Sequence, residues 1–250
     1  MSAGNSHIAK IAYDFWKSSG GRSAAPCDIS GAVSLALPID IISLSDLSLG
    51  KIENWLEQRR ISVNIGLNDR ILHGFILVSR GSGFIFINGT DSEEERRYTI
   101  AHEVSHFLLD YRLPRDNAVK KMGSTILEVI DGYREPTMGE RIDGALSALA
   151  TKPYSHLLEK VGDGTFNSWE IQKSENDADD LAVELLAPSY EIASTIRPTK
   201  KRLSFSSIKD QCYRLLRYKY MIPNSVAEIY STRLAYGLTG GPSLLDQIGL

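Results

Sequence analysis

The sequence predicts an α+β fold, because segments with helical periodicity lie on both sides of one short stretch of strands. Apolar residues recur at helical spacing in residues 6–17, 45–60 and 174–187. Between Ile61 and Asn88 the pattern changes to short runs of branched and aromatic residues, separated by Asn-Asp and Gly-Ser-Gly turn signals. Helices and strands that are segregated along the chain are typical of this fold class.

The composition is that of a globular chain. Its 250 residues are enough for one large domain with its own core. A hydrophobic fraction of 42% and a charged fraction of 24% exclude fibrous, low-complexity and disordered classes. The 28 Lys and Arg against 31 Asp and Glu give a net charge of -3. The chain as a whole is therefore not a polycation that coats nucleic acid.

The sequence favours a cytoplasmic location. The N-terminal segment lacks the basic start, apolar run and small-residue cleavage site of a secretory signal. The most apolar early run, 32–44, contains Pro38 and is shorter than the ~20 residues that a membrane helix needs. Cys27 and Cys212 are far apart in the sequence and form no C-x-x-C motif, which suits a reducing compartment. We expect no membrane segment.

The strands are expected to form a small antiparallel sheet, and a strong helix is expected to follow it. The three runs that predict strands are Ile-Ser-Val-Asn-Ile, Phe-Ile-Leu-Val and Phe-Ile-Phe-Ile-Asn. After them, Ser92 and Glu95 form an S-x-x-E capping box, and acidic residues occupy the positive end of the helix. This helix is predicted to run to about Leu109. The helix at 174–187 is predicted to stop at Pro188.

The remaining segments are expected to be mostly helical. Residues 111–173 contain several Gly and Pro and predict short helices joined by loops. We interpret them as a helical insertion into a domain that spans residues 1–188. Residues 189–250 then form a helical C-terminal region.

This C-terminal region contains a basic segment and a final helix. Residues 197–220 hold eight Lys or Arg and one acid. The final helix is predicted to start at an S-x-x-E box formed by Ser225 and Glu228 and to end near Gly237. The basic segment could belong to a helix-turn-helix-like unit that contacts DNA phosphates. It could also be a solvated helical face whose Lys and Arg stems cover the core, and we favour this second interpretation.

The helix that starts at Ser92 carries an H-E-x-x-H string, in which His102 and His106 flank Glu103. Residues four apart lie about one turn apart on the same helix face, so both imidazoles can bind a single Zn²⁺. Glu103 projects beside that face and can accept a proton from a metal-bound water. The string therefore predicts a zinc site with Glu103 as the catalytic base.

A catalytic zinc needs a third protein ligand and one open position for water. Several later acids could supply the ligand: Asp110, Glu128, Glu135, Glu140, Glu159, Glu170 and Glu175. Glu175 is favoured because it lies on the second strong helix, where Ala178 and Ala182 allow close packing against another helix. Asp179 lies one turn after Glu175 and is expected to accept the free ring N–H of a zinc-bound histidine.

Two stretches of the chain resemble the motifs of a known family. Residues 97–109, Arg-Tyr-Thr-Ile-Ala-His-Glu-Val-Ser-His-Phe-Leu-Leu, are similar to the RFTLAHELGHLLL stretch of the ImmA/IrrE metallopeptidases. Residues 175–188 are similar to their ExxANxFAxxLLMP segment, and residues 84–88 resemble the strand that precedes the first motif. The resemblance implies a zincin-like metallopeptidase domain in which His102, His106 and Glu175 bind one zinc ion.

The chain departs from the family pattern at three places. Ser105 replaces a glycine, Asp179 replaces an asparagine, and the gap between the two motifs is longer than usual. The first two changes keep a small residue and a hydrogen-bond acceptor, respectively. The long gap means that residues 110–174 must be accommodated near the active site.

By this resemblance the chain is a zinc-dependent endopeptidase of the anti-repressor type, which cleaves a regulatory protein. The implied partner is a helix-turn-helix repressor encoded nearby, in stress response or mobile-element control. The alternative is a zinc-stabilised transcriptional regulator that binds protein or DNA and hydrolyses nothing. The intact Glu103 favours the enzyme, because a structural zinc needs no base. An oxyanion-stabilising residue is also expected, and four candidates stay open: Tyr98, Tyr111, Tyr154 and His156.

Overall fold

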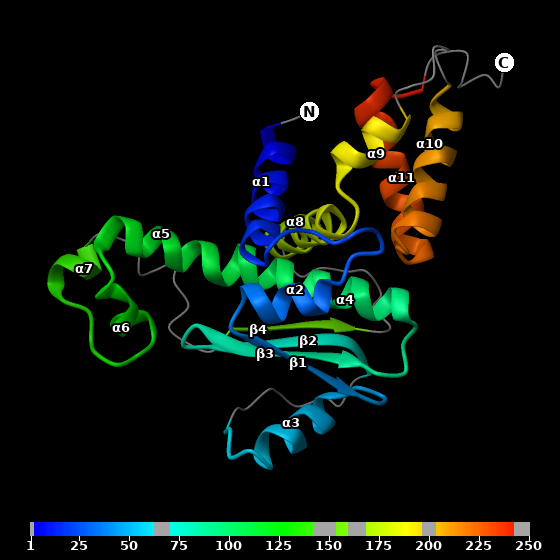
Figure 1. Cartoon of the computed structure of the whole chain (residues 1–250). Helices are drawn as coiled ribbons and strands as arrows, with labels where there is room; N and C mark the ends of the chain where they lie inside the picture. The colour runs from blue at the N-terminus through cyan, green and yellow to red at the C-terminus, as the bar shows by residue number, and fades with distance from the viewer. Residues whose placement is uncertain (1–2, 63–70, 143–153, 160–168, 197–203, 243–250) are drawn as a thin grey trace.

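A four-stranded mixed sheet forms the centre of the fold in the computed structural model (Figure 1). The structure describes residues 3–62, 71–142, 154–159, 169–196 and 204–242. In their order across the sheet, the strands are β1 (Ile39–Leu44), β3 (Ser82–Asn88), β2 (Leu72–Ser79) and β4 (Tyr154–Glu159). The strand β2 pairs antiparallel with both β3 and β4, whereas β1 runs parallel to β3. The predicted α+β class is confirmed.

The sheet differs from the purely antiparallel one that the sequence predicted. The second and third predicted runs are strands, in β2 and β3. The first run has no strand at Ile61 and Ser62, and its other residues lie outside the described ones. The strand β1 comes from the apolar run 32–44, and its partner β3 is distant in the sequence. Strands that are distant in the sequence are not joined by a hairpin turn, so no local turn signal predicts that they pair.

The two faces of the sheet contact different layers. Alternate residues of β2 and β3, such as Ile76 and Ile85, belong to the large core beneath α2 (Ile29–Ala36) and α4 (Glu93–His106). The intervening residues, such as Phe86, pack in a smaller core with α3, whose bounds are Leu49–Glu57. The helix α3 lies on the opposite side of the sheet from α2 and α4 in Figure 1. This alternation follows from the two-residue period of a strand.

The helix α4 begins as the sequence predicts. Ser92 Oγ accepts the backbone N–H of Glu95, and the Glu95 side chain accepts the backbone N–H of Ser92. Apolar and polar residues alike are buried along α4, which lies between the sheet and α8 (Trp169–Leu186). The chain then continues into a π-helical turn, η1 (Phe107–Arg112). Such turns are frequent at functional sites.

The segment that was predicted as a helical insertion begins as helices and ends in a strand. The helices α5 (Leu113–Met122), α6 (Ile126–Ile130) and α7 (Met138–Ile142) extend to one side of the sheet in Figure 1. They have a small apolar cluster of their own, and Arg115 donates two hydrogen bonds to Asp131. The expectation of helices alone was incomplete, because the same segment supplies the edge strand β4.

The helices at the two ends of the chain close the large core above α4 and α8. They are α1 (Ala3–Ser18), α9 (Ser189–Ile196), α10 (Phe205–Arg214) with the π-helical turn η3 (Leu215–Lys219), and α11 (Asn224–Thr239). Trp16 Nε1 donates to the Leu185 carbonyl at 3.1 Å, and the Arg97 guanidinium donates to the Tyr220 carbonyl. Residues of α9 to α11 therefore share one core with the first 188 residues. Among the described helices, none combines the length and the apolar character that crossing a bilayer requires.

The predicted start of the last helix was wrong. The helix α11 begins at Asn224, directly after Pro223, and no side chain caps it. Asn224 Nδ2 donates to Glu228 Oε1 at 3.1 Å, so Glu228 does not form a capping box with Ser225. A proline fixes the φ angle at the helix start and can replace a side-chain signal there.

Candidate metal centre

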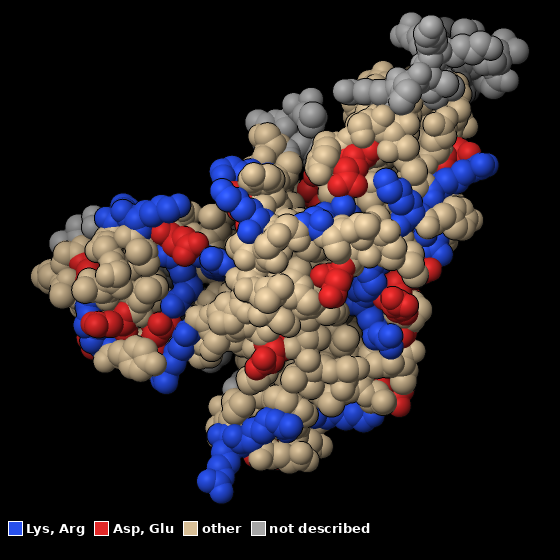
Figure 2. Space-filling model, in the orientation of Figure 1, with Lys and Arg blue, Asp and Glu red and all other residues tan. Residues whose placement is uncertain are grey.

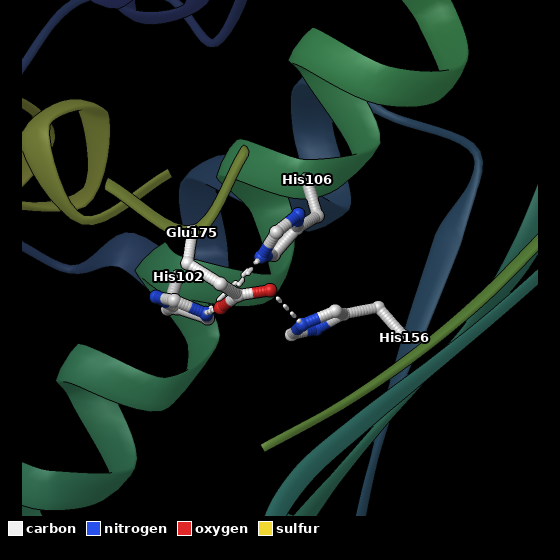
Figure 3. A group of neighbouring side chains, drawn as sticks. All are labelled: His102, His106, His156 and Glu175. Carbon is white, nitrogen blue, oxygen red and sulfur yellow. Dashed lines mark hydrogen bonds and ion pairs between the residues drawn. The ribbon is translucent and has the colours of Figure 1, made fainter. Parts of the chain in front are cut away.

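Four side chains from three elements converge beside α4 (Figure 3). His102 and His106 project from α4, Glu175 from α8 and His156 from the edge strand β4. One potential ligand atom from each residue lies within 4.8 Å of the others. Imidazole nitrogens and a carboxylate are the ligands that zinc uses in catalytic sites.

Three of these atoms already have the spacing of zinc ligands. His102 Nε2 and His106 Nε2 are 3.2 Å apart, and Glu175 Oε2 lies 3.5 Å from the first and 3.6 Å from the second. Tetrahedral ligands at zinc distances of about 2.0 to 2.1 Å lie about 3.3 Å from one another. The residues therefore fit a zinc ion, and they are the three that the sequence suggested as ligands.

Close helix packing brings Glu175 to the two histidines. Ala178 and Ala182 are fully buried where α8 crosses α4. Small side chains at these positions let the helices approach, so the short Glu175 side chain spans the gap between them. The helix α8 begins at Trp169, before the predicted start at Ser174, so Glu175 lies within the helix and not at its end.

Each of the two α4 histidines has a carboxylate on its second ring nitrogen. His102 Nδ1 lies 3.0 Å from Asp179 Oδ1, and His106 Nδ1 lies 2.7 Å from Asp110 Oδ2. Such contacts fix the ring so that Nε2 faces the metal position. Asp179 is where the sequence analysis expected it. Asp110, one of the candidate third ligands, instead contacts His106 from the π-helical turn η1.

Hydroxyl groups hold these two carboxylates in turn. Tyr98 Oη donates to Asp179 Oδ1 at 2.6 Å. Tyr154 Oη and Ser174 Oγ donate to Asp110 Oδ2 at 3.2 and 2.9 Å. Burial and the Asp179 charge raise the pKa of Tyr98, and burial and the Asp110 charge raise the pKa of Tyr154. Both phenols therefore stay protonated and keep donating.

Glu103 is completely buried next to the metal position. Its Oε2 lies 3.2 Å from His156 Nδ1, whereas its Oε1 has no hydrogen-bond partner within the described part of the chain. Gly74 of β2 makes room for it, because a Cβ there would lie 2.9 Å from Glu103 Oε1 and 2.4 Å from Thr99 Cγ2. A buried carboxylate oxygen without a donor is costly. The site is thus suited to a further group, such as a water molecule, beside Glu103.

His156 is the member of the group that the sequence did not identify as a metal-site residue. It was one of four candidates for oxyanion stabilisation. Of these four, it is the one that belongs to the group of four side chains at the candidate metal site. Its Nε2 lies 2.8 Å from Glu175 Oε1, and its ring stacks on His106 with centroids 3.7 Å apart. The register of the sheet explains this position, because His156 pairs with the buried Ile76 and so faces α4.

The three tyrosine candidates have other contacts. Tyr98 and Tyr154 donate to the carboxylates described above, and Tyr111 Oη accepts the backbone N–H of Gly81 at 2.7 Å. No motif surrounds His156 in the sequence, so only the strand pairing could have revealed its place.

The electrostatics of the site favour a cation among the carboxylates. Burial alone would lower the pKa of His102, but hydrogen bonds to Asp179 and Glu175 outweigh it and raise this pKa to about 9. Burial likewise opposes protonation of His156, yet the charge and hydrogen bond of Glu103 raise its pKa to about 10. Hydrogen bonds from the histidines lower the pKa of Glu175 despite its burial. Protons on the histidines thus supply positive charge that a metal ion would replace.

The other acids considered as third ligands lie elsewhere or fall outside the described side chains. Glu128 and Glu140 form ion pairs with Arg134, and Glu135 with Arg141, in the α6–α7 region. The side chains of the remaining two, Glu159 and Glu170, are not among those that the structure describes.

One comparison with known proteins gave a match. Residues 57–125 match the model of the IrrE N-terminal-like domain, which represents peptidase family M78. The matched segment includes α4 with His102, Glu103 and His106, and it ends before His156 and Glu175. No curated protein and no solved structure matched the chain significantly.

Proposed function

We propose that this chain, whose residues 57–125 belong to the IrrE N-terminal-like domain of the M78 metallopeptidases, is a zinc-dependent endopeptidase that binds one zinc ion. One observation carries the proposal: three ligand atoms 3.2 to 3.6 Å apart lie beside a fully buried glutamate. A site that only stabilises the fold has no use for this buried carboxylate, whereas peptide hydrolysis needs a base there.

The residues of the site can be assigned roles in hydrolysis. His102, His106 and Glu175 would hold the metal. When bound, zinc lowers the pKa of a water molecule toward ~7 and polarises the scissile carbonyl. Glu103 takes a proton from the attacking water and returns it to the leaving amine as the C–N bond breaks. Asp179 and Asp110 keep the two α4 imidazoles in the tautomer whose Nε2 is free.

The proposed substrate is a regulatory protein, a helix-turn-helix repressor encoded near this chain, and the proposed setting is cytoplasmic stress response or mobile-element control. The resemblance of both motifs to the ImmA/IrrE metallopeptidases supports this choice. To test it, the zinc-loaded protein is incubated with the neighbouring repressor, and the products are identified by mass spectrometry. A single new cleavage site that disappears with chelator and in Glu103→Gln is expected. An intact repressor with fully zinc-loaded protein under inducing conditions would contradict the proposal.

The second candidate is a non-catalytic regulator that zinc stabilises and that binds protein or DNA. DNA contact through 197–220 is not favoured by the described part of this segment. Arg214 Nε lies 3.1 Å from Asp210 Oδ2, and Arg217 Nη1 lies 2.5 Å from Glu94 Oε2. Figure 2 shows red side chains beside blue ones over the C-terminal helices on this face. An arginine that is already paired with a carboxylate contributes less to the attraction of DNA phosphates.

A salt titration distinguishes the two candidates. If the chain binds DNA through this segment, the logarithm of the affinity falls steeply with the logarithm of salt concentration. Substitution of Lys200, Lys201 and Arg202, which lie outside the described residues, should then abolish binding. Salt-dependent binding together with an intact repressor would favour the regulator.

A further inference from the structure

The three histidines of the site share one arrangement. In each, Nδ1 contacts a carboxylate and Nε2 faces Glu175. The carboxylates and their distances from Nδ1 are Asp179 at 3.0 Å, Asp110 at 2.7 Å and Glu103 at 3.2 Å. A histidine that binds a metal almost always donates its second ring N–H to a carboxylate, a carbonyl or water. By this criterion His156 has the same two contacts as His102 and His106, a carboxylate at Nδ1 and Glu175 at Nε2.

From this pattern we infer that His156 is a fourth protein ligand of the metal ion. Its Nε2 lies 2.8 Å from Glu175 Oε1, the second oxygen of the carboxylate whose Oε2 faces the other two histidines. Its ring is stacked on that of His106 with centroids 3.7 Å apart, so the two imidazoles lie side by side at the site. The widest separation among the four ligand atoms is 4.8 Å. Side-chain movements of about 1 Å would bring it near the ~3.3 Å of a tetrahedral zinc site.

With His156 as a ligand, four protein ligands would fill the coordination sphere of the metal ion and leave no position for water. A catalytic zinc keeps one position open for water, whereas sites with four protein ligands are closed. The contact with His156 Nδ1 also occupies Oε2, one of the two carboxylate oxygens of the proposed base Glu103. The chain in this form is therefore latent, and hydrolysis requires His156 to leave the ion and release Glu103.

The position of His156 in the fold allows this change. Within the described ranges, the strand β4 is the edge strand of the sheet and pairs with β2, whereas His102 and His106 lie on a buried helix. His156 can therefore leave the ion without disrupting the α4–α8 packing that holds the other three ligands. This part of the inference rests on the proposed peptidase function. The identification of His156 as a ligand does not.

X-ray absorption at the zinc edge tests the ligand assignment on the full-length, zinc-loaded protein. Three imidazoles are expected in the wild type and two in His156→Ala. The apparent zinc affinity, measured by competition with a chromophoric chelator, should fall at least about tenfold in that variant. His73→Ala is the matched control, because His73 lies on the neighbouring strand and contacts Asp91 instead. Two imidazoles in the wild type would overturn the assignment, whether or not the variant folds.

Cleavage assays then separate this inference from the proposed function. A latent site predicts that zinc-saturated His156→Ala cleaves the repressor faster than the wild type without an inducing signal. Slower cleavage by the zinc-saturated variant would overturn latency, because it would show that His156 assists the reaction. Three imidazoles in a wild type that cleaves nothing under any condition would instead refute the proposed function and leave the ligand assignment standing.

Discussion

His102 Nδ1 lies 3.0 Å from Asp179 Oδ1, one turn beyond Glu175 on α8. One helix therefore supplies both a metal ligand and the acceptor that orients another ligand. Burial opposes ionisation of Asp179, but its hydrogen bonds with His102 and Tyr98 outweigh this and lower its pKa. The carboxylate is thus charged when it holds the imidazole.

Asp179→Ala is expected to weaken zinc binding by about 10- to 100-fold, because the His102 ring loses the partner that fixes its orientation. A chelator competition assay on the full chain measures this change. Asp177→Ala, two residues away on the same helix, serves as the control and should leave the affinity within about twofold. Equal affinities of the two variants would show that Asp179 does not orient His102.

Glu103→Gln is expected to keep its zinc and to lose about 10² to 10⁴ in cleavage rate, because an amide cannot accept the proton of the attacking water. Metal content and cleavage of the neighbouring repressor are measured on the same preparation. His106→Ala, which removes a ligand, should lose both. Wild-type cleavage by the glutamine variant would exclude Glu103 as the base.

Gly74→Ala should destabilise the fold by about 1 to 3 kcal/mol, because the new methyl group meets Thr99 Cγ2 and Glu103 Oε1 in a filled space. Thermal or denaturant unfolding of the metal-free protein measures the loss. Adding Thr99→Ser removes the Thr99 methyl group and should restore part of the stability. Gly139→Ala, which meets nothing within 4 Å, is the control.

Zinc affinity should rise with pH until about 9 to 10. In the metal-free protein the pKa of His102 is raised to about 9 and that of His156 to about 10, so zinc must displace protons from them. The stability of the metal-free fold has the opposite pH dependence and falls as pH rises. The contribution of the protonated histidines to its stability is fully present below pH 6.5 and is lost as pH rises through about 9 to 10. Calorimetry in buffers of different ionisation enthalpy counts the released protons, and no release at pH 7 would contradict the prediction.

Ser92→Ala should cost about 1 kcal/mol, because Ser92 caps α4 and its partner Glu95 completes the box. Ser225→Ala is a matched control at a helix start where the serine makes no cap, and it should change stability by less than about 0.5 kcal/mol. Denaturant unfolding of both variants compares the two sites. Equal losses would show that the α4 capping box does not contribute.

Sequence periodicity predicted the parts of the site that depend on a single helix. The spacing of His102 and His106 places both imidazoles on one face of α4, and the capping box fixes where that helix starts. The same reasoning places Asp179 one turn after Glu175. It failed at Ser225, where the same S-x-x-E pattern stands beside a proline and an asparagine that start the helix differently.

The sequence by itself determined which side chains could bind a metal from α4, and it favoured Glu175 among several acids. Only the tertiary structure decided that Asp110 contacts His106, that Gly74 makes room for Glu103 and that His156 reaches the site. Helix geometry repeats every 3.6 residues, so neighbours on one helix can be read from spacing. The pairing of β4 with β2 joins residues that are distant along the chain, and no local pattern encodes which strands meet.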